Sequence, residues 1–174
     1  GPLPAMVTGT GKSPTIMRQA NLARAGQPHL RPLAPDDREG WGSLWRDYLA
    51  FYGTERPAQL YDLYFERLLS TEPHEFHAIV AEVEGRLVGL THYLFHRHGW
   101  REENVCYLQD LYAVPEMRGK GLGRALIEAV YDAADRAGAP TVYWLTQTDN
   151  AEARKLYDRI GRVSDFIRYD RAIA

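Results

Sequence analysis

The sequence is short of three features that would place the protein in a specialised class. It has a single cysteine, Cys106, in 174 residues, so no internal disulfide can form, and a reducing, cytoplasmic setting is the expected location. It holds no apolar run that approaches membrane-spanning length, so we expect no membrane partner. Its formal net charge is only −2, so we expect no nucleic-acid partner.

The composition that remains is that of an ordinary globular protein, with 45% hydrophobic and 25% charged residues. Residues 1–27 stand apart, because they contain basic but no acidic side chains and begin with a run rich in proline, glycine, serine and threonine. We therefore expect a flexible N-terminal tail over residues 1–27, whose first two residues, Gly1-Pro2, are typical of a tag remnant. Residues 28–174 are expected to form a single domain.

The most informative stretch is residues 104–131, where the pattern predicts a strand, a glycine-rich loop and a helix. Residues 105–114 are rich in β-branched and aromatic side chains, and apolar residues at helical spacing begin at Leu122. Between them, three glycines expose backbone N–H groups where the helix begins, and basic side chains flank them. We interpret this loop as a phosphate-binding site. Its glycines are Gly119, Gly121 and Gly123, and its basic residues are Arg118, Lys120 and Arg124.

Two common phosphate-binding motifs do not fit the loop. A dinucleotide fingerprint requires G-x-G-x-x-G, whereas the spacing here is G-x-G-x-G. A P-loop requires G-x-x-x-x-G-K-[ST], and the sequence Gly11-Lys12-Ser13 has Met6 where the first glycine should stand. The remaining alternative is a glycine turn that only packs tightly, and the basic residues at the helix start argue against it.

Two motifs resemble those of the GNAT acetyltransferases (Gcn5-related N-acetyltransferases). Arg118-x-x-Gly121-x-Gly123, after a strand that ends in Leu-Tyr-Ala-Val-Pro, is similar to the acyl-CoA signature of that family, [RQ]-x-x-G-x-[GA]. Asn150-x-x-Ala153-x-x-x-Tyr157 resembles the N-x-x-A-x-x-x-Y helix that follows it. The resemblance covers about residues 28–171, and residues 107–112 and 143–146 are similar to the branch of histone, polyamine and D-amino-acid acetyltransferases.

The resemblance implies an α/β (α+β) fold, with a mixed, mostly antiparallel central sheet flanked by helices. Acyl-CoA would lie in a V-shaped splay between the central strands. The implied activity is an acetyl-CoA-dependent N-acetyltransferase that passes acetyl directly to a primary amine in a ternary complex. The acceptor would be a polyamine, an amino acid or a lysine side chain of a protein or peptide. The alternatives are a transferase that uses another acyl-CoA and a non-catalytic acyl-CoA sensor. By the same resemblance we expect a homodimer.

The resemblance also assigns residues to the cofactor. Tyr157 would protonate the leaving thiolate as a general acid, which a phenol can do. Leu111 and Ala113 would offer backbone groups to the acetyl carbonyl and the pantetheine arm. The full set expected at the cofactor is Leu111, Tyr112, Ala113, Arg118, Gly119, Lys120, Gly121, Leu122, Gly123, Arg124, Asn150 and Tyr157.

The general base is an open question. Relatives in the suspected branch often carry Glu where Gln109 stands, and glutamine cannot accept a proton at neutral pH. Side chains alternate along a strand, so Tyr107 and Gln109 face one way and Asp110 the other. A water chain past Gln109 and Tyr107, another acid or an amine that binds already neutral all remain open. Asp110 would serve only if a bulge turned it inward, and we favour a hydrogen-bonded structural role for it. Gln109 is assigned to orienting substrate or water.

Two aromatic-rich helices are expected early in the chain, one begun by Pro35-Asp36-Asp37 and ended by Gly53, the other begun by Pro57. In the GNAT fold this region caps the substrate site, so its tyrosines fit either a core or an acceptor pocket. The substrate-binding candidates are Tyr48, Tyr52, Tyr107 and Gln109, and Tyr61 and Tyr64 are open between the two roles.

Strands are expected at residues 29–33, 76–83, 87–95, 141–146 and 166–169, and a further helix after Asp149-Asn150. His92, His96 and His98 are an even number of positions apart, so in a strand their side chains would lie on the same face, which suggests metal binding at first sight. Successive side chains on one face of a strand are about 6.7 Å apart, however, which is long for one coordination shell. We therefore expect no metal.

Overall fold

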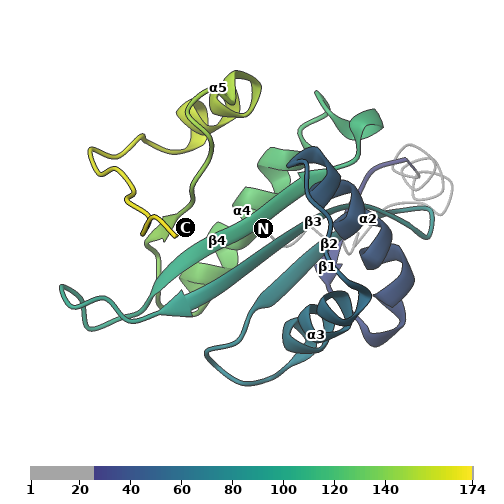
Figure 1. The fold of residues 1–174 in the computed structure, drawn as a ribbon, viewed down its shortest axis with the longest axis horizontal. Coiled ribbons are helices and arrows are strands. Elements are labelled where there is room, and N and C mark those ends of the chain that lie inside the picture. The colour runs from purple at the N-terminus through teal and green to yellow at the C-terminus, as the bar shows by residue number, and fades with distance from the viewer. Residues whose placement is uncertain (1–25, 174) are drawn as a thin grey trace, which may run out of the picture. The chain divides into compact units, whose positions relative to one another are not determined.

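The computed structural model describes residues 26–173, and these fall into two compact units that divide after Trp144 (Figure 1). The predicted tail, residues 1–27, lies almost wholly outside the described residues. Within the described part, no helix is long and apolar enough to cross a membrane.

The first unit is built on a five-stranded sheet with the order β1-β2-β3-β4-β5. Neighbouring strands are antiparallel, except that β4 and β5 run parallel. The sheet is therefore mixed and mostly antiparallel, which confirms the predicted fold class. Its strands are β1 (His29–Pro32), β2 (His77–Val83), β3 (Arg86–His96), β4 (Val105–Ala113) and β5 (Val142–Tyr143).

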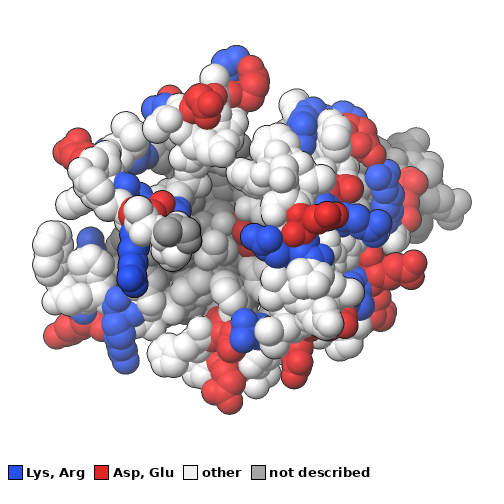
Figure 2. All heavy atoms as spheres, viewed as in Figure 1, with Lys and Arg blue, Asp and Glu red and all other residues white. Residues whose placement is uncertain are grey.

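Helices cover both faces of this sheet. The helices α2 (Arg38–Phe51) and α3 (Ala58–Leu69) lie over one face, and α4 (Leu122–Arg136) lies over the other (Figure 1). The short 3-10 turns η1 (Pro35–Asp37) and η2 (Pro115–Met117) precede α2 and the glycine loop. Each helix turns its apolar residues, at helical spacing, toward the sheet. Basic and acidic side chains lie interspersed over α2 and α3 on the face shown in Figure 2.

The turn between β2 and β3 has the conformation that its sequence predicts. Glu84 and Gly85 both have positive φ, at 49° and 80°. Two successive residues with positive φ are the mark of the two-residue hairpin turn that matches strand twist. The hairpin therefore forms where the Glu84-Gly85 pair indicates it.

Two predicted strands differ from the structure. Residues 141–146 form a strand only at Val142–Tyr143, where β4 offers partners in Cys106 and Tyr107. Residues 166–169 form no strand, and the side chains of Phe166 and Tyr169 are 81% and 88% exposed. Apolar and aromatic composition shows that a segment suits a strand, but a strand also needs an edge to pair with, and composition does not reveal that edge.

The second unit, residues 145–173, contains the helix α5 (Ala151–Ile160). Its half-buried residues are Ala153, Arg154, Leu156, Tyr157 and Ile160. Asn150 precedes the helix as predicted, but its side chain does not cap it. The Asn150 Nδ2 group instead donates to Thr146 Oγ1 at 3.1 Å.

Asp37 occupies the position before α2, but its carboxylate does not cap that helix. Arg31 donates to Oδ2 at 2.7 Å and to Oδ1 at 2.9 Å, and the Ala34 N–H donates to Oδ2 at 2.7 Å. The two-pronged guanidinium matches a carboxylate better than single backbone N–H groups do. The hydrogen bonds from Arg31 hold the pKa of Asp37 below its usual value of 3.8.

Replacing Asp37 with asparagine is expected to lower the free energy of unfolding at pH 7 by about 2 kcal/mol, because a hydrogen-bonded ion pair is lost. A carboxyl group with a depressed pKa stabilises the fold above the pKa of the unfolded chain, and that stabilisation is lost as the pH falls through the folded value. The difference between wild type and Asp37→Asn should therefore shrink below about pH 4. Urea unfolding at pH 7 and pH 3 measures this, with the exposed neighbour Asp36→Asn as the control. An equal difference at both pH values would contradict the ion-pair account.

Candidate active site

Over most of its length, β4 has a strand partner on one side only. The strand β5 pairs with it just at Cys106 and Tyr107, so within the described residues no strand follows β4 on that side from residue 108 onward. On the other side, the Val114 N–H donates to the Val88 carbonyl of β3 at 3.0 Å. Backbone groups in an antiparallel pair alternate between the two edges, so those of Ala113 and Leu111 face the edge without a strand. These are the two residues expected to offer backbone groups to the acyl chain.

The glycine-rich loop directly follows this strand and leads into α4. Gly119 and Gly121 have φ values of 76° and 82°, which side chains rarely adopt, and a Cβ at either position would meet nothing within 4 Å. The first helical bond of α4 runs from the Ala125 N–H to the Gly121 carbonyl at 3.0 Å. The N–H groups of residues 122–124 therefore precede the helical ladder and have no partner within it. Such a loop fits phosphate groups.

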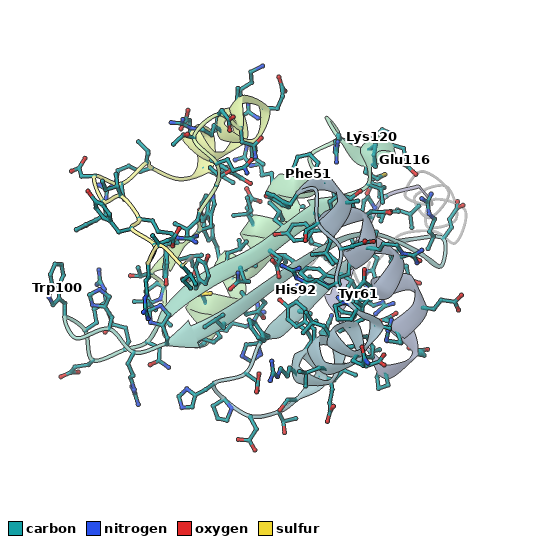
Figure 3. The ribbon with its side chains drawn as sticks, in the orientation of Figure 1. Phe51, Tyr61, His92, Trp100, Glu116 and Lys120 are labelled. Atoms are coloured by element: carbon teal, nitrogen blue, oxygen red, sulfur yellow. The ribbon has the colours of Figure 1, made fainter. Side chains whose placement is uncertain are left out.

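The basic side chains of the loop have different surroundings. The Arg118 guanidinium lies 5.7 Å from the Phe51 ring centre and 5.9 Å from that of Tyr112. Because these contacts are with rings rather than with carboxylates, its charge stays available to an anion. Arg124, in contrast, is paired with Glu128 at 2.7 Å on the exposed side of α4. Figure 3 shows Phe51 at the end of α2 that lies towards the loop carrying Glu116 and Lys120.

A β-bulge interrupts the pairing of β3 with β4. His92 lies opposite Asp110 and Tyr93 lies opposite Leu108, so the register skips Gln109. Gln109 is exposed and Asp110 is buried, which agrees with their predicted opposite orientations. The bulge therefore places Gln109 on the open side of the strand and directs Asp110 toward α2 and α3.

Asp110 is the centre of a buried hydrogen-bond cluster between the sheet and the helices α2 and α3. Its side chain is 6% exposed. The carboxylate accepts hydrogen bonds from the Tyr48 hydroxyl at 2.9 Å, the Tyr64 hydroxyl at 2.6 Å and His92 Nδ1 at 2.9 Å. The Thr91 hydroxyl donates to the Asp110 carbonyl oxygen at 2.9 Å. These four hydrogen bonds agree with the structural role expected for Asp110.

The protonation of His92 follows from its second partner. Trp41 Nε1–H can only donate, and it lies 3.0 Å from His92 Nε2. Nε2 must therefore accept, which leaves the single ring proton on Nδ1, from which it is donated to Asp110. The histidine is neutral, and it lies among aromatic side chains beneath α2 and α3 (Figure 3).

The tyrosines around Asp110 stay protonated. Burial first, and the charge of Asp110 second, raise the pKa of Tyr48 and of Tyr64 far above the ordinary phenol value. The same two causes raise the pKa of Tyr52, with a hydrogen bond to Tyr48 acting in the opposite direction. None of the three is a phenolate, and Tyr48 and Tyr64 donate hydrogen bonds to Asp110.

The structure divides the predicted aromatic candidates into different groups. Tyr48 and Tyr52 lie together, with ring centres 5.1 Å apart, and Tyr52 is 45% exposed. Tyr64 is buried against Trp41 and Trp45 and belongs to the core. Tyr61, half-buried, lies edge-on to Trp41 as well. The Tyr107 ring stacks on that of Tyr143, next to the point where β5 ends.

The three histidines expected on the same face of a strand do not share one site. His92 belongs to the Asp110 cluster, whereas His96 Nε2 contacts the Tyr143 hydroxyl at 2.7 Å. His98 lies in the loop after β3, where its Nδ1 accepts the Trp100 N–H at 3.1 Å. Within the described residues no group of histidine, cysteine and carboxylate side chains is arranged to hold a metal. The Trp41–His92 pair was not anticipated, because its members lie 51 positions apart and no local pattern links them.

The lone cysteine, Cys106, is a buried thiol in β4. Burial raises the pKa of the Cys106 thiol to about 12, which makes it a poor nucleophile. Tyr157 and Asn150 belong to the second unit, and their assigned roles at the cofactor stay predictions.

The sheet, the open edge of β4 and the glycine loop together define an acyl-CoA-dependent transferase. The profile described as "Acetyltransferase (GNAT) family" matches residues 41–161. The chain belongs to this family, it is an N-acetyltransferase, and its acyl donor is acetyl-CoA. The residues present fit that donor, since the loop offers N–H groups that the helix does not use, and β4 is paired on its outer side only at Cys106 and Tyr107 among the described residues.

Known proteins similar to this chain include enzymes with small amine substrates. It is 36% identical over 143 residues to D-amino-acid N-acetyltransferase HPA3 of Saccharomyces cerevisiae. The aligned region covers 82% of this chain and 89% of that protein. It is 34% identical over 94 residues to the thialysine N-epsilon-acetyltransferase of Mus musculus, with 49% of this chain and 55% of that protein covered.

Solved structures show the same fold. A ribosomal-protein-alanine N-acetyltransferase from Brucella melitensis biovar Abortus 2308 is similar with a TM-score of 0.67 at 25% identity, covering 83% of this chain and 99% of that one. The aminoglycoside acetyltransferase AAC(6')-Iy, bound to a CoA bisubstrate analogue, has a TM-score of 0.73 at 17% identity. The matched region covers 85% of this chain and 99% of that one.

Proposed function

We propose that this protein transfers acetyl from acetyl-CoA directly to the primary amine of a small molecule or a lysine side chain, in a ternary complex. The observation that supports the acceptor side is the Asp110 carboxylate, which has Tyr48 and Tyr52 beside it and no cationic side chain of the described residues among its hydrogen-bond partners. A negative charge bordered by aromatic rings suits an ammonium group. The two named relatives act, by their names, on D-amino acids and thialysine, which are also amines.

On the cofactor side, the proposal assigns the pyrophosphate to the loop from Arg118 to Arg124. The free N–H groups at the start of α4 and the charge of Arg118 support this. The acetyl carbonyl would meet the backbone groups of Leu111 and Ala113, which would also steady the negative charge that develops on its oxygen. Acetyl-CoA supplies the activated acyl group as a thioester.

Tyr157 would return a proton to the thiolate that leaves, and Gln109 would orient the acceptor or a water molecule. Gln109 fits that role because it is exposed at the bulge, and it has hydrogen-bonding groups but no proton affinity at neutral pH. Tyr107, stacked on Tyr143, would border the acceptor beside it.

The test is release of free thiol from acetyl-CoA with spermidine, lysine, thialysine, a D-amino acid, an L-amino acid and a histone-tail peptide as acceptors. Turnover that depends on one acceptor class is expected, with propionyl-CoA as the comparison donor. Binding of acetyl-CoA without turnover for any acceptor would instead favour the non-catalytic sensor. Faster turnover with the longer donor would favour a transferase for another acyl-CoA.

We also propose that the chain forms a homodimer in the cytoplasm. The C-terminal segment supports the first part, because Phe166, Ile167, Tyr169 and Ile173 are between 76% and 88% exposed. Exposed apolar side chains in one short segment are typical of an interaction surface. A dimer is expected in size-exclusion chromatography with light scattering, and removal of residues 165–174 is expected to give a monomer. A monomeric full-length chain would contradict the proposal.

A further inference from the structure

We propose that Asp110, acting through the hydroxyl group of Tyr48, takes up the proton that the acceptor ammonium must lose before it attacks the thioester. The inference rests on the proposed function. Gln109 cannot accept a proton at neutral pH, and Asp110 would accept it instead. In this relay Tyr48 touches the amine, and Asp110 is the positioning residue behind it.

Every hydrogen bond of the cluster is directed toward Asp110. Trp41 donates to His92, and His92 in turn donates to Oδ2 of Asp110. Tyr64 donates to the same oxygen and Tyr48 to Oδ1. A carboxylate that accepts from all its partners carries no proton of its own. Among residues 26–173, the titratable groups that face it are Tyr48 and Tyr52 of α2, Tyr64 of α3 and His92 of β3, and none of these carries a positive charge.

Only one of the two tyrosines bonded to Asp110 leads to solvent. Tyr64 is 9% exposed and enclosed by core rings, including that of Phe76 at 5.0 Å. Tyr48 is half-buried and lies beside Tyr52, whose ring is 45% exposed. The Tyr48 hydroxyl donates its proton to Asp110 and is also hydrogen-bonded to Tyr52, so one lone pair of its oxygen remains for an N–H group of the amine. The path from solvent to the carboxylate therefore runs through Tyr52 and Tyr48.

The proton transfer balances without any further reactant. The ammonium gives one proton to the Tyr48 oxygen while the Tyr48 proton moves to Oδ1 of Asp110, and the amine lone pair becomes free. That pair forms the C–N bond as the C–S bond breaks, and the sulfur takes up the second amine proton, through Tyr157 in the proposed function. The proton on Asp110 then returns to solvent through Tyr48 and Tyr52.

The two tyrosines provide a matched pair of variants. Tyr48→Phe and Tyr64→Phe each remove one hydroxyl and one hydrogen bond to the same carboxylate, and Tyr64 makes the shorter bond. With the best acceptor of the panel above, Tyr48→Phe is expected to lower kcat about 30-fold at pH 7, a much larger loss than that of Tyr64→Phe, because only the Tyr48 hydroxyl receives the amine proton. The deficit of Tyr48→Phe should shrink as the pH rises toward the pKa of the amine, because a neutral amine needs no relay.

Equal losses in the two variants, or a Tyr48→Phe deficit that does not change with pH, would overturn the relay while leaving the transferase intact. A wild-type chain that acetylates none of the acceptors would remove the proposed function and the relay together. Thermal unfolding of both variants separates a loss of fold from a loss of proton transfer.

A second measurement needs no turnover. The ¹⁵N chemical shifts of His92 are expected to report a ring protonated on Nδ1 alone in the absence of acceptor, because Nε2 accepts the Trp41 N–H. A doubly protonated ring would overturn the proposal, because the charge of Asp110 would then be neutralised by His92. The same spectrum of Trp41→Phe tests whether the indole N–H selects this tautomer.

Discussion

Tyr157→Phe is expected to lower kcat by about 1000-fold with little change in KM for acetyl-CoA, because it removes the proton that the leaving thiolate takes up. The change keeps the ring and therefore the half-buried face of α5 to which Tyr157 belongs. An interaction made only as the C–S bond breaks affects kcat and not cofactor binding. Steady-state kinetics with the best acceptor, over a range of acetyl-CoA concentrations, gives both constants.

Tyr169→Phe is the control for this prediction. It makes the same chemical change in the same unit, at a residue that is 88% exposed and outside the motif. It should leave kcat unchanged. A Tyr157→Phe enzyme with wild-type kcat would show that the thiolate takes its proton from another source, such as water, and would remove Tyr157 from the mechanism.

Gly121→Val is expected to raise KM for acetyl-CoA by about 100-fold, with a much smaller effect on kcat once the cofactor is bound. Gly121 has a φ of 82° and directly precedes α4, where the free N–H groups would receive the pyrophosphate. A β-branched side chain resists this conformation and would occupy the open space that the phosphates need. Calorimetric titration with CoA measures the same loss without turnover.

Gly138→Val separates the loss of the phosphate site from backbone strain. Gly138 lies just after the other end of the same helix, with a φ of 70°, and a Cβ at this position, as at Gly121, would meet no atom within 4 Å. Both variants should therefore lose similar stability, of about 1–2 kcal/mol. Only the Gly121 variant should lose affinity for CoA, and equal losses of affinity would mean that the loop does not bind the phosphates.

Local patterns were sufficient to predict the elements that depend on neighbours in the chain. The β2–β3 turn depends on Glu84 and Gly85 alone, and both adopt the positive φ that such a turn requires. The helix α4 begins directly after Gly121, where the loop motif indicates its start. Such features are encoded within a few residues, so the sequence contains all the information that determines them.

Features that depend on distant residues were not predictable in the same way. The His92–Asp110 contact requires the register of β3 against β4, and that register is shifted by a bulge at Gln109. Asp37 stands where a helix begins, as expected, but its carboxylate binds Arg31 instead of capping α2. In each case the tertiary structure, and not the local sequence, sets the partner of the carboxylate.

The glycine loop was assigned from local spacing, whereas the places of the α2 aromatic residues depend on packing. The motif residues of the glycine loop were assigned from their spacing, and the positive φ values at Gly119 and Gly121 give that spacing a physical reason. The aromatic residues of α2 fitted core and pocket equally well from sequence. Their separation, with Tyr48 and Tyr52 towards solvent and Trp41 fully buried, comes from the packing of α2 against β3 and α3.

The most direct test of the central claim is to follow the acetyl group itself. Wild-type protein is incubated with acetyl-CoA labelled with ¹³C in the acetyl group and with the acceptor panel, and the products are identified by NMR. The account predicts an N-acetyl product of one acceptor class, formed in step with free CoA and without a labelled protein intermediate. Label that stays on CoA with every acceptor, or that becomes bound covalently to the protein, would contradict direct transfer to an amine.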